Sequence, residues 1–349
     1  MDASKISLDR LKKHWFGICI LLILFLATFL RFYNYENRWG LAYDQAHDAL
    51  VARYALEHHK IPLVGPFSSA GPFQTGGEWY WIIMAAYAIY PHSVLSPWIA
   101  ITLISLVFVF VAILVGSEIA GKGFGILLGM LSTVSTGQIA QSVSLTNQSP
   151  LALVSLLAIW SMVRFAKTKS DRYLFFLALS VTLAASIHLQ GISLVLLIVT
   201  TLLFFGVRTK RSFLMIILGI LIPIIPLIIF DLKNDFVNSR GFLQYVIYDQ
   251  YKIPFEALGR RWLTYLGVFW PNAWSHVIGG IREVAYIQIL SLVFVFLYGL
   301  YRKSISKIWL TIAVTFLLMV VLLRYTRTPL FDSYIVFLHP FILLLTGWA

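Results

Sequence analysis

The feature that most constrains this chain is a series of long apolar runs. Many of them extend for about 17 to 20 residues, which is long enough to cross a hydrocarbon core about 30 Å thick. With 59% hydrophobic and only 12% charged residues, the composition is typical of an α-helical integral membrane protein. The runs lie at 16–31, 97–117, 123–140, 150–166, 173–187, 190–207, 212–230, 284–301, 308–323 and 333–348.

The distribution of basic residues predicts how these runs are oriented. Lysine and arginine cluster in five connectors, and all five lie in the cytoplasm only if the shorter aromatic run at 79–91 does not cross the membrane. We therefore expect about ten transmembrane helices, a cytoplasmic N-terminus and an interfacial helix at 79–91. In this arrangement eleven of the fifteen carboxylates lie on the outer face.

Other features of the sequence narrow the class of protein further. The first apolar run has no small-residue cleavage site after it, which favours a retained helix over a signal peptide. The single cysteine, Cys19, excludes an internal disulfide framework and a zinc cluster built on thiolates. The net charge of +12 is explained by the cytoplasmic connectors, so nucleic acid is not an expected partner. We expect one domain over 1–349, with two large outer segments at 32–96 and 231–283.

Carboxylates of the first outer segment are the first candidates for chemistry. Asp44 and Asp48 lie one turn apart in a predicted amphipathic surface helix at 44–57, and a solvated polar face is the ordinary explanation for such a pair. Glu78 stands where the polar loop meets the aromatic helix. It can bind a metal, contact a sugar or serve as the acidic first-turn residue of that helix, and the last is slightly favoured.

Polar residues on other outer connections are further candidates. Asn147 faces the same compartment, and His188 lies between two closely spaced runs, where a lone histidine is usually structural. Arg324 and Arg327 also lie outside, where the positive-inside bias gives no reason for them. Arginine can bond phosphate oxygens in bidentate fashion, and contact with ordinary lipid headgroups is the alternative. Arg31 is a weaker candidate of the same kind.

In the order of these motifs along the chain and in the expected side of the membrane, this sequence resembles the polyprenol-dependent membrane glycosyltransferases of the GT-C fold. The resemblance is strongest to family 39, which includes protein O-mannosyltransferases and the aminoarabinose transferase of lipid A. In that family the first outer loop carries an acidic motif, usually Asp-Glu, and the matching pair here is Asp44-Gln45. The resemblance covers nearly the whole chain. It continues through LVGPFSSAGPF, GEWYWIIMAAYAIYP, SLTNQSP, ASIHLQGISL, IIFDLKNDFVNSRGF and DSYIVFLHPFILLLTG.

The resemblance implies an all-α, polytopic GT-C-like fold in the plasma (inner) membrane. It also implies transfer of a hexosyl or pentosyl group from a polyprenyl-phosphate-linked donor to a lipid, glycan or protein acceptor at the extracytoplasmic face. Such a reaction needs a carboxylate that accepts the acceptor's proton and cations that stabilise the leaving phosphate. We assign the first role to Asp44. We expect substrate binding, including the phosphate contact of the two arginines, by Asp48, Glu78, Asn147, His188, Arg324 and Arg327.

Two departures from the family pattern affect the cofactor prediction. Gln45 replaces the usual glutamate, and Asn147 occupies a place where relatives often have aspartate. No metal ligand is therefore assigned, and a divalent cation is left open as a cofactor. The chain also stops within or just after a helix at 348–349, without the further spans or outer domain of many relatives, which leaves open that it is a fragment.

Two other classes of protein are compatible with a polytopic chain that has outer charges. Transporters and lipid flippases commonly show two related halves and broken helices near the midplane, and this sequence shows no convincing repeat. An inactive membrane scaffold of the same fold also stays open, because Gln45 and Asn147 weaken the acidic set.

Overall fold

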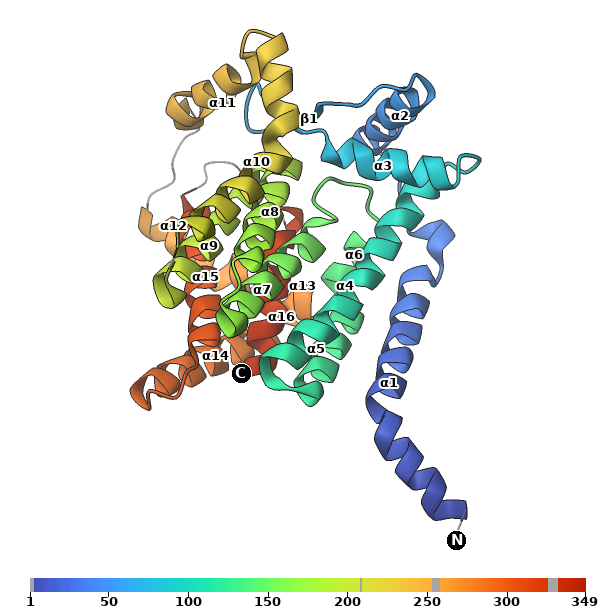
Figure 1. Ribbon diagram of the computed structural model, residues 1–349, viewed down its shortest axis with the longest axis vertical. Helices are drawn as coiled ribbons and strands as arrows, with labels where there is room; N and C mark the ends of the chain where they lie inside the picture. Colours follow the sequence, from blue (N-terminus) through green and yellow to red (C-terminus); the bar gives the residue numbers. More distant parts are fainter. Residues whose placement is uncertain (1–2, 208, 253–257, 326–331) are drawn as a thin grey trace.

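The fold is a bundle of helices, most of them apolar, seen in a computed structural model that describes residues 3–207, 209–252, 258–325 and 332–349 (Figure 1). Six of the described helices are long and apolar enough to cross a membrane, so the chain is an integral membrane protein. These are α1 (Ala3–Phe32), α4 (Ser96–Ala120), α7 (Leu151–Thr168), α10 (Lys210–Lys233), α14 (Arg282–Tyr301) and α15 (Lys307–Arg324).

Shorter apolar helices account for the remaining predicted runs, so the all-α class is confirmed. The number of ten spans stays a prediction, because these elements are shorter than 18 residues each. They are α5 (Lys122–Val134), α8 (Arg172–Ile187), η2 (Leu189–Leu194) with α9 (Val195–Phe205), and η5 (Asp332–Leu338) with α16 (His339–Trp348).

The sequence predicts one helix at 123–140, but the structure has two helices there. α5 ends at Val134, and α6 (Thr136–Gln141) begins after Ser135. The Ser135 side chain accepts a hydrogen bond from the backbone N–H of Gln138, which is the ordinary way for a serine to begin a new helix. Local capping therefore interrupts a segment whose hydropathy alone is continuous.

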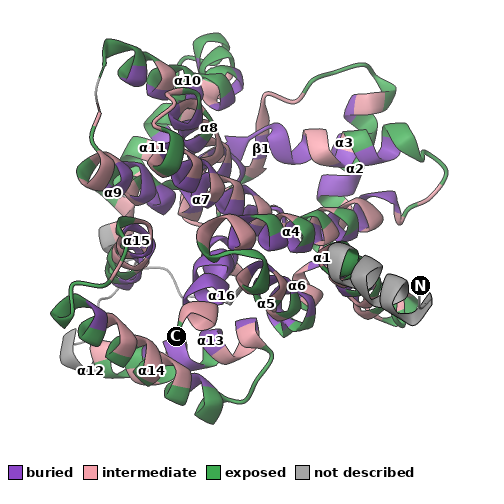
Figure 2. Ribbon diagram, turned by 60° about the horizontal axis from the view of Figure 1, so that its bottom comes forward, coloured by how far each residue is buried: buried purple, intermediate pink, exposed green. Residues whose placement is uncertain are grey.

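Burial differs sharply among the apolar helices. Within its most apolar window, α7 is 61% buried inside the protein, whereas α1 and α14 are only 17% and 11% buried. Figure 2 shows α16 mostly buried near the centre, with exposed residues covering much of the outer helices. Because the exposed surfaces of α1 and α14 are themselves apolar, lipid is the solvent that suits them.

Small residues allow α4 and α5 to approach closely. A Cβ atom added to Gly125 would lie 1.9 Å from the Ser117 Oγ and 2.5 Å from the Ile113 carbonyl oxygen. One added to Gly129 would lie 2.4 Å from a side-chain carbon of Ile113. These two glycines, four positions apart on α5, therefore allow close packing against α4.

Two arginines donate hydrogen bonds to backbone carbonyls on either side of the break between α5 and α6. Arg31 is fully buried, donates to the Ser105 hydroxyl at 2.8 Å, and reaches the carbonyl of Ser132 at 3.2 Å. Arg38 donates to the carbonyl of Ile139 at 3.1 Å and to carbonyls at the end of α1. Helix ends leave carbonyl groups without intrahelical partners, and these guanidinium groups satisfy them. Arg31 thus bonds groups in the protein interior. The sequence instead suggested it, as a weaker candidate, for contact with a phosphate.

The first outer segment covers the end of the bundle that lies opposite the N-terminus (Figure 1). It contains a short 3-10 helix, two α-helices and a two-stranded antiparallel hairpin in which Val64 pairs with Gly76 and Phe67 pairs with Gln74. The helix expected at 79–91 is present as α3, which lies crosswise at this end (Figure 1). The elements are η1 (Tyr35–Asn37), α2 (Tyr43–Glu57), β1 (Val64–Phe67), β2 (Gln74–Gly76) and α3 (Glu78–Ile89).

The second outer segment is joined to this hairpin. The Asn238 side chain accepts a 2.6 Å hydrogen bond from the backbone N–H of Gln74 and donates to its carbonyl at 3.2 Å. Asp231, at the end of α10, accepts from the backbone N–H groups of Asn238 and Ser239. The described elements of this segment are α11 (Val237–Ile247), η3 (Asp249–Lys252), α12 (Leu258–Thr264), η4 (Tyr265–Phe269) and α13 (Trp270–Ile278).

The last of these helices, α13, packs within the bundle. Trp270, Trp274 and Val277 are buried, and the carbonyl of His276 accepts a 2.6 Å hydrogen bond from Thr136 at the start of α6. The predicted outer segment at 231–283 therefore returns into the interior before α14 begins.

Candidate functional site

The C-terminal end of α8 gathers three of the residues singled out from the sequence. Glu78 accepts a 2.8 Å hydrogen bond from the hydroxyl of Ser186. Asn147 donates to the carbonyl of Ile187 at 3.0 Å. His188 follows directly, so residues from three segments that are far apart in the sequence meet at consecutive positions of one helix end.

Glu78 is a buried carboxyl group with an incomplete set of partners. Only 6% of the residue is exposed, and within the described part of the chain its Oε1 atom has no hydrogen-bond partner. Burial raises the pKa of Glu78, which the hydrogen bonds from its own backbone N–H and from Ser186 offset only in part. Space here is tight, because a Cβ on Gly76 would lie 2.2 Å from the Glu78 carboxylate.

His188 has an environment that favours its neutral form. The amide nitrogen of Gln148 donates to His188 Nε2 at 3.1 Å, and the Tyr334 ring lies 5.6 Å away between centroids. Burial lowers the pKa of His188 to about 4, so the imidazole is neutral at neutral pH. A neutral ring can accept the Gln148 hydrogen bond, whereas an imidazolium could not.

Asp48 links α2 to α3 through hydrogen bonds. Its carboxylate accepts hydrogen bonds from Trp79 Nε1 at 2.7 Å and from the Tyr80 hydroxyl at 3.3 Å, and it contacts His47 Nδ1 at 3.2 Å. Burial raises the pKa of Asp48, and these hydrogen bonds lower it by less. Asp44, one turn earlier, is exposed. The two aspartates that the helical spacing placed on one face thus have different environments.

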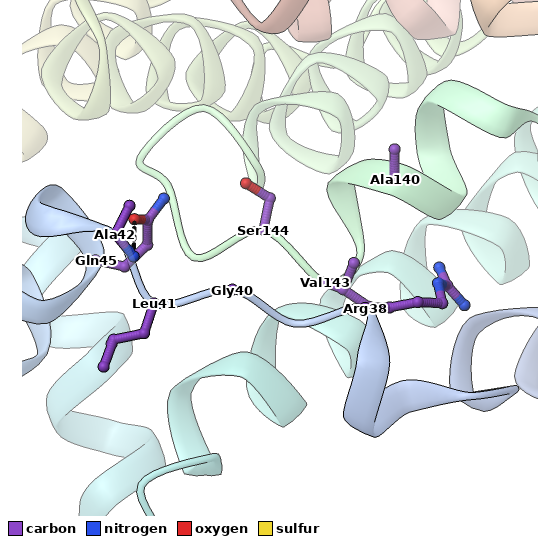
Figure 3. A pocket seen from close by; sticks show the side chains of 8 residues that line it. All are labelled: Arg38, Gly40, Leu41, Ala42, Gln45, Ala140, Val143 and Ser144. Carbon is purple, nitrogen blue, oxygen red and sulfur yellow. Dashed lines mark hydrogen bonds between the residues drawn. The ribbon is translucent and has the colours of Figure 1, made fainter.

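A pocket of about 350 Å³ opens beside the first turn of α2 (Figure 3). Gln45 lies in this turn, and its Oε1 accepts a 3.0 Å hydrogen bond from the backbone N–H of Ala42. The sequence identified Gln45 only as a departure from the family pattern. Its place in the pocket depends on α6 and the following loop, which no local signal connects to α2. The pocket is lined by Arg38, Gly40, Leu41, Ala42, Gln45, Ala140, Val143 and Ser144.

Arg324 lies on another side of the bundle. It is fully buried at the end of α15, with its guanidinium carbon 4.9 Å from the centroid of the Trp262 ring and 5.9 Å from that of Tyr325. Figures 1 and 2 both place α15 and α2 on opposite sides of the molecule. The structure therefore does not bring Asp44 next to Arg324. Arg327 lies outside the described residues.

The cation that the sequence left open has no preformed site in the described ranges. No group of three His, Cys, Asp or Glu side chains gathers there in a way that could hold a metal ion. The carboxylates that define the first outer segment are instead separated, with Asp48 bonded to α3 and Glu78 bonded to α8.

Comparison with known proteins identifies the architecture. No protein-family model and no curated protein sequence matches the chain. Among solved structures, ArnT from Cupriavidus metallidurans in the apo state matches with a TM-score of 0.69 and 13% identity, over 97% of this chain and 59% of that one. The chain has the GT-C fold.

Two further structures with this fold were crystallised or solved with lipid phosphates. ArnT bound to undecaprenyl phosphate matches with a TM-score of 0.66 and 12% identity, over 99% of this chain and 60% of that chain. The oligosaccharyltransferase AglB from Archaeoglobus fulgidus, in complex with an inhibitory peptide and a dolichol-phosphate, matches with a TM-score of 0.57 and 12% identity. That match covers 97% of this chain and 50% of AglB. The chain thus spans about half to three fifths of the length of these neighbours.

Proposed function

We propose that this protein is a membrane glycosyltransferase that moves a sugar from a polyprenyl-phosphate-linked donor to an acceptor at the extracytoplasmic face. The observation that carries the proposal is a GT-C fold whose Asp44 is exposed at the start of α2, at the end of the bundle opposite the N-terminus. Solved neighbours with undecaprenyl phosphate and dolichol-phosphate support the class of donor.

In the proposed reaction Asp44 acts as the general base. Its carboxylate accepts the proton of an acceptor hydroxyl while that oxygen forms a bond to the anomeric carbon of the donor. The bond between that carbon and the phosphate oxygen breaks with inversion, and polyprenyl phosphate leaves with the bonding electrons. Asp44 suits this role better than Asp48. The Asp48 carboxylate is buried and already bonded to other side chains of the protein, so it is not accessible to an acceptor.

Arg324 and Arg327 stabilise the leaving phosphate in this proposal. Because α2 and α15 lie on opposite sides of the bundle, transfer requires the first outer segment and the end of α15 to approach one another when the donor binds. The acceptor in this proposal is a lipid, glycan or protein that carries a free hydroxyl group.

Substitution of Asp44 tests the proposal. Purified protein in proteoliposomes would be given an undecaprenyl-phosphate-linked sugar and a membrane extract as acceptor, and released undecaprenyl phosphate would be measured. Loss of a general base lowers turnover by about 100-fold or more, which is the result expected for Asp44→Asn. Glu57→Gln is the matched control, because Glu57 is also exposed and lies on the same helix but is paired with Arg53. Undiminished turnover of Asp44→Asn would remove Asp44 from the mechanism.

The side of the membrane is tested separately with an impermeant maleimide on intact cells, in a Cys19→Ser background. His59→Cys lies in the exposed turn after α2, and Lys303→Cys lies in the exposed connector between α14 and α15. The proposal expects labelling at position 59 and none at position 303. The reverse pattern would place Asp44 in the cytoplasm and end the proposal.

A further inference from the structure

The pocket beside Gln45 has the chemistry of a site for a neutral ligand. Its volume of about 350 Å³ lies in the lower part of the range of small-molecule clefts, about 300 to 1,000 Å³. Five of its lining residues are glycine or apolar, and no carboxylate is among them. The groups that could recognise a ligand are therefore the side chains of Arg38, Gln45 and Ser144.

The Nη donors of Arg38 are already engaged. Its guanidinium donates to the carbonyls of Leu30 at 2.9 Å, Arg31 at 3.2 Å and Ile139 at 3.1 Å. Figure 3 shows its side chain extending away from Gln45 and Ser144. An anion in the pocket would thus meet a cation whose donors are directed at backbone oxygens, and a ligand ammonium would meet no carboxylate.

Gln45 and Ser144 instead offer neutral hydrogen-bonding groups. In Figure 3 the Gln45 amide and the Ser144 hydroxyl point toward one another across the open space. The Oε1 atom of Gln45 is held by the backbone of Ala42, which leaves its amide nitrogen directed to the pocket. Within the described chain, neither that nitrogen nor the Ser144 hydroxyl has a protein hydrogen-bond partner. One is a donor, and the other can donate or accept.

We propose that this pocket binds one uncharged sugar ring, whose hydroxyl groups bond Gln45 and Ser144 while its carbon face packs on apolar residues of the lining. The inference rests on the proposed function, because it assigns the sugar of that reaction to a place next to Asp44, which precedes Gln45 on α2. It also gives a reason for an amide at this position, since a glutamate would offer only acceptors and a charge.

A single reactive cysteine tests the pocket. In a Cys19→Ser background, Ser144→Cys is labelled with a small maleimide in detergent, with D-mannose, D-glucose, D-galactose, L-arabinose or N-acetylglucosamine added at increasing concentration. We expect labelling at position 144 and slowing by at least one of these sugars, with no slowing by inorganic phosphate. Ser142→Cys is the matched control, because Ser142 is fully buried and its hydroxyl bonds the carbonyl of Ile139.

A second substitution assigns the recognition to Gln45. Gln45→Glu keeps the oxygen that accepts from Ala42, and it replaces the donor toward the pocket by a charged acceptor. Loss of one hydrogen bond raises the half-protecting sugar concentration by about 2- to 10-fold. The inference is overturned if position 144 does not react, if positions 142 and 144 react equally, if phosphate protects as well as sugar, or if no sugar protects.

These outcomes are distinct from failure of the proposed function. Transfer that persists while sugars give no protection removes the pocket and leaves the transferase. Protection by sugar in a protein that shows no transfer of its own keeps the pocket and removes the transferase.

Discussion

The carboxylate of Asp48 and the indole N–H of Trp79 form a 2.7 Å hydrogen bond between two residues that are fully or almost fully buried. This contact joins α2, which carries Asp44 and Gln45, to α3. The position of the candidate base and of the pocket therefore depends on a contact that takes no part in the proposed chemistry.

Loss of the Trp79 donor should destabilise the protein. Trp79→Phe leaves a buried carboxylate oxygen without its shortest hydrogen bond, at a cost of about 1–3 kcal/mol. The melting temperature of the detergent-solubilised protein, followed by fluorescence, should fall. Tyr80→Phe is the comparison, and its effect should be smaller because the Tyr80 bond is 3.3 Å long. A larger effect of Tyr80→Phe would contradict the assignment.

Glu78 should make stability depend on pH. Its pKa is raised above 4.5 by burial, so the folded state favours the protonated carboxyl. The stability that Glu78 contributes is complete below pH 4.5 and is lost as the pH rises through its folded-state pKa. The melting temperature of the wild type, measured relative to Glu78→Gln, should therefore fall as the pH rises. The exposed Glu57→Gln serves as the control variant, and a difference that stays constant with pH would be inconsistent with this account.

Packing between α4 and α5 should tolerate no side chain at Gly125. A Cβ there would lie 1.9 Å from the Ser117 hydroxyl, so Gly125→Ala should cost about 1–3 kcal/mol and lower the melting temperature. Gly123→Ala, on the same helix, meets nothing within 4 Å and should not lower it. Equal melting temperatures for the two variants would show that the helices are further apart than described.

Removal of the Arg31 guanidinium should weaken the junction at the break between α5 and α6. Arg31→Met keeps the length of the side chain but loses the bonds to Ser105 and Ser132, at a cost of about 1.5–3 kcal/mol for a charged donor. Thermal unfolding should show the loss, whereas Arg53→Met, which changes an exposed pair, should shift the midpoint little. Retention of wild-type stability by Arg31→Met would argue against a structural role.

The helices could be predicted because hydropathy and length are local properties. Each predicted apolar run coincides with helical structure, and the run at 79–91 could be separated from the spans by its length and its aromatic residues. The break at Ser135 was missed because a capping hydroxyl interrupts a helix without changing its hydropathy. Likewise, the return of α13 into the bundle depends on contacts with α6 that are distant in sequence.

The candidate site was only partly predictable for the same reason. The sequence identified Glu78, Asn147 and His188 separately, but their meeting at the end of α8 is a tertiary property. Asp48 and Asp44 share a helical face by spacing, yet the position of Trp79 buries only Asp48. Assignment of Asp44 as base stays a prediction that the Asp44→Asn measurement decides.

The side chain of Asn238 completes the edge of a strand that lies 164 positions earlier in the chain, bonding both backbone groups of Gln74. A break of the chain in the connector between α9 and α10 would therefore divide this strand edge between two polypeptides. Each piece would keep membrane helices of its own, but the hairpin beside α3 would be complete only after the pieces associate. Co-expressed halves thus offer a complementation system in which assembly of the hairpin and its neighbours can be followed independently of membrane insertion.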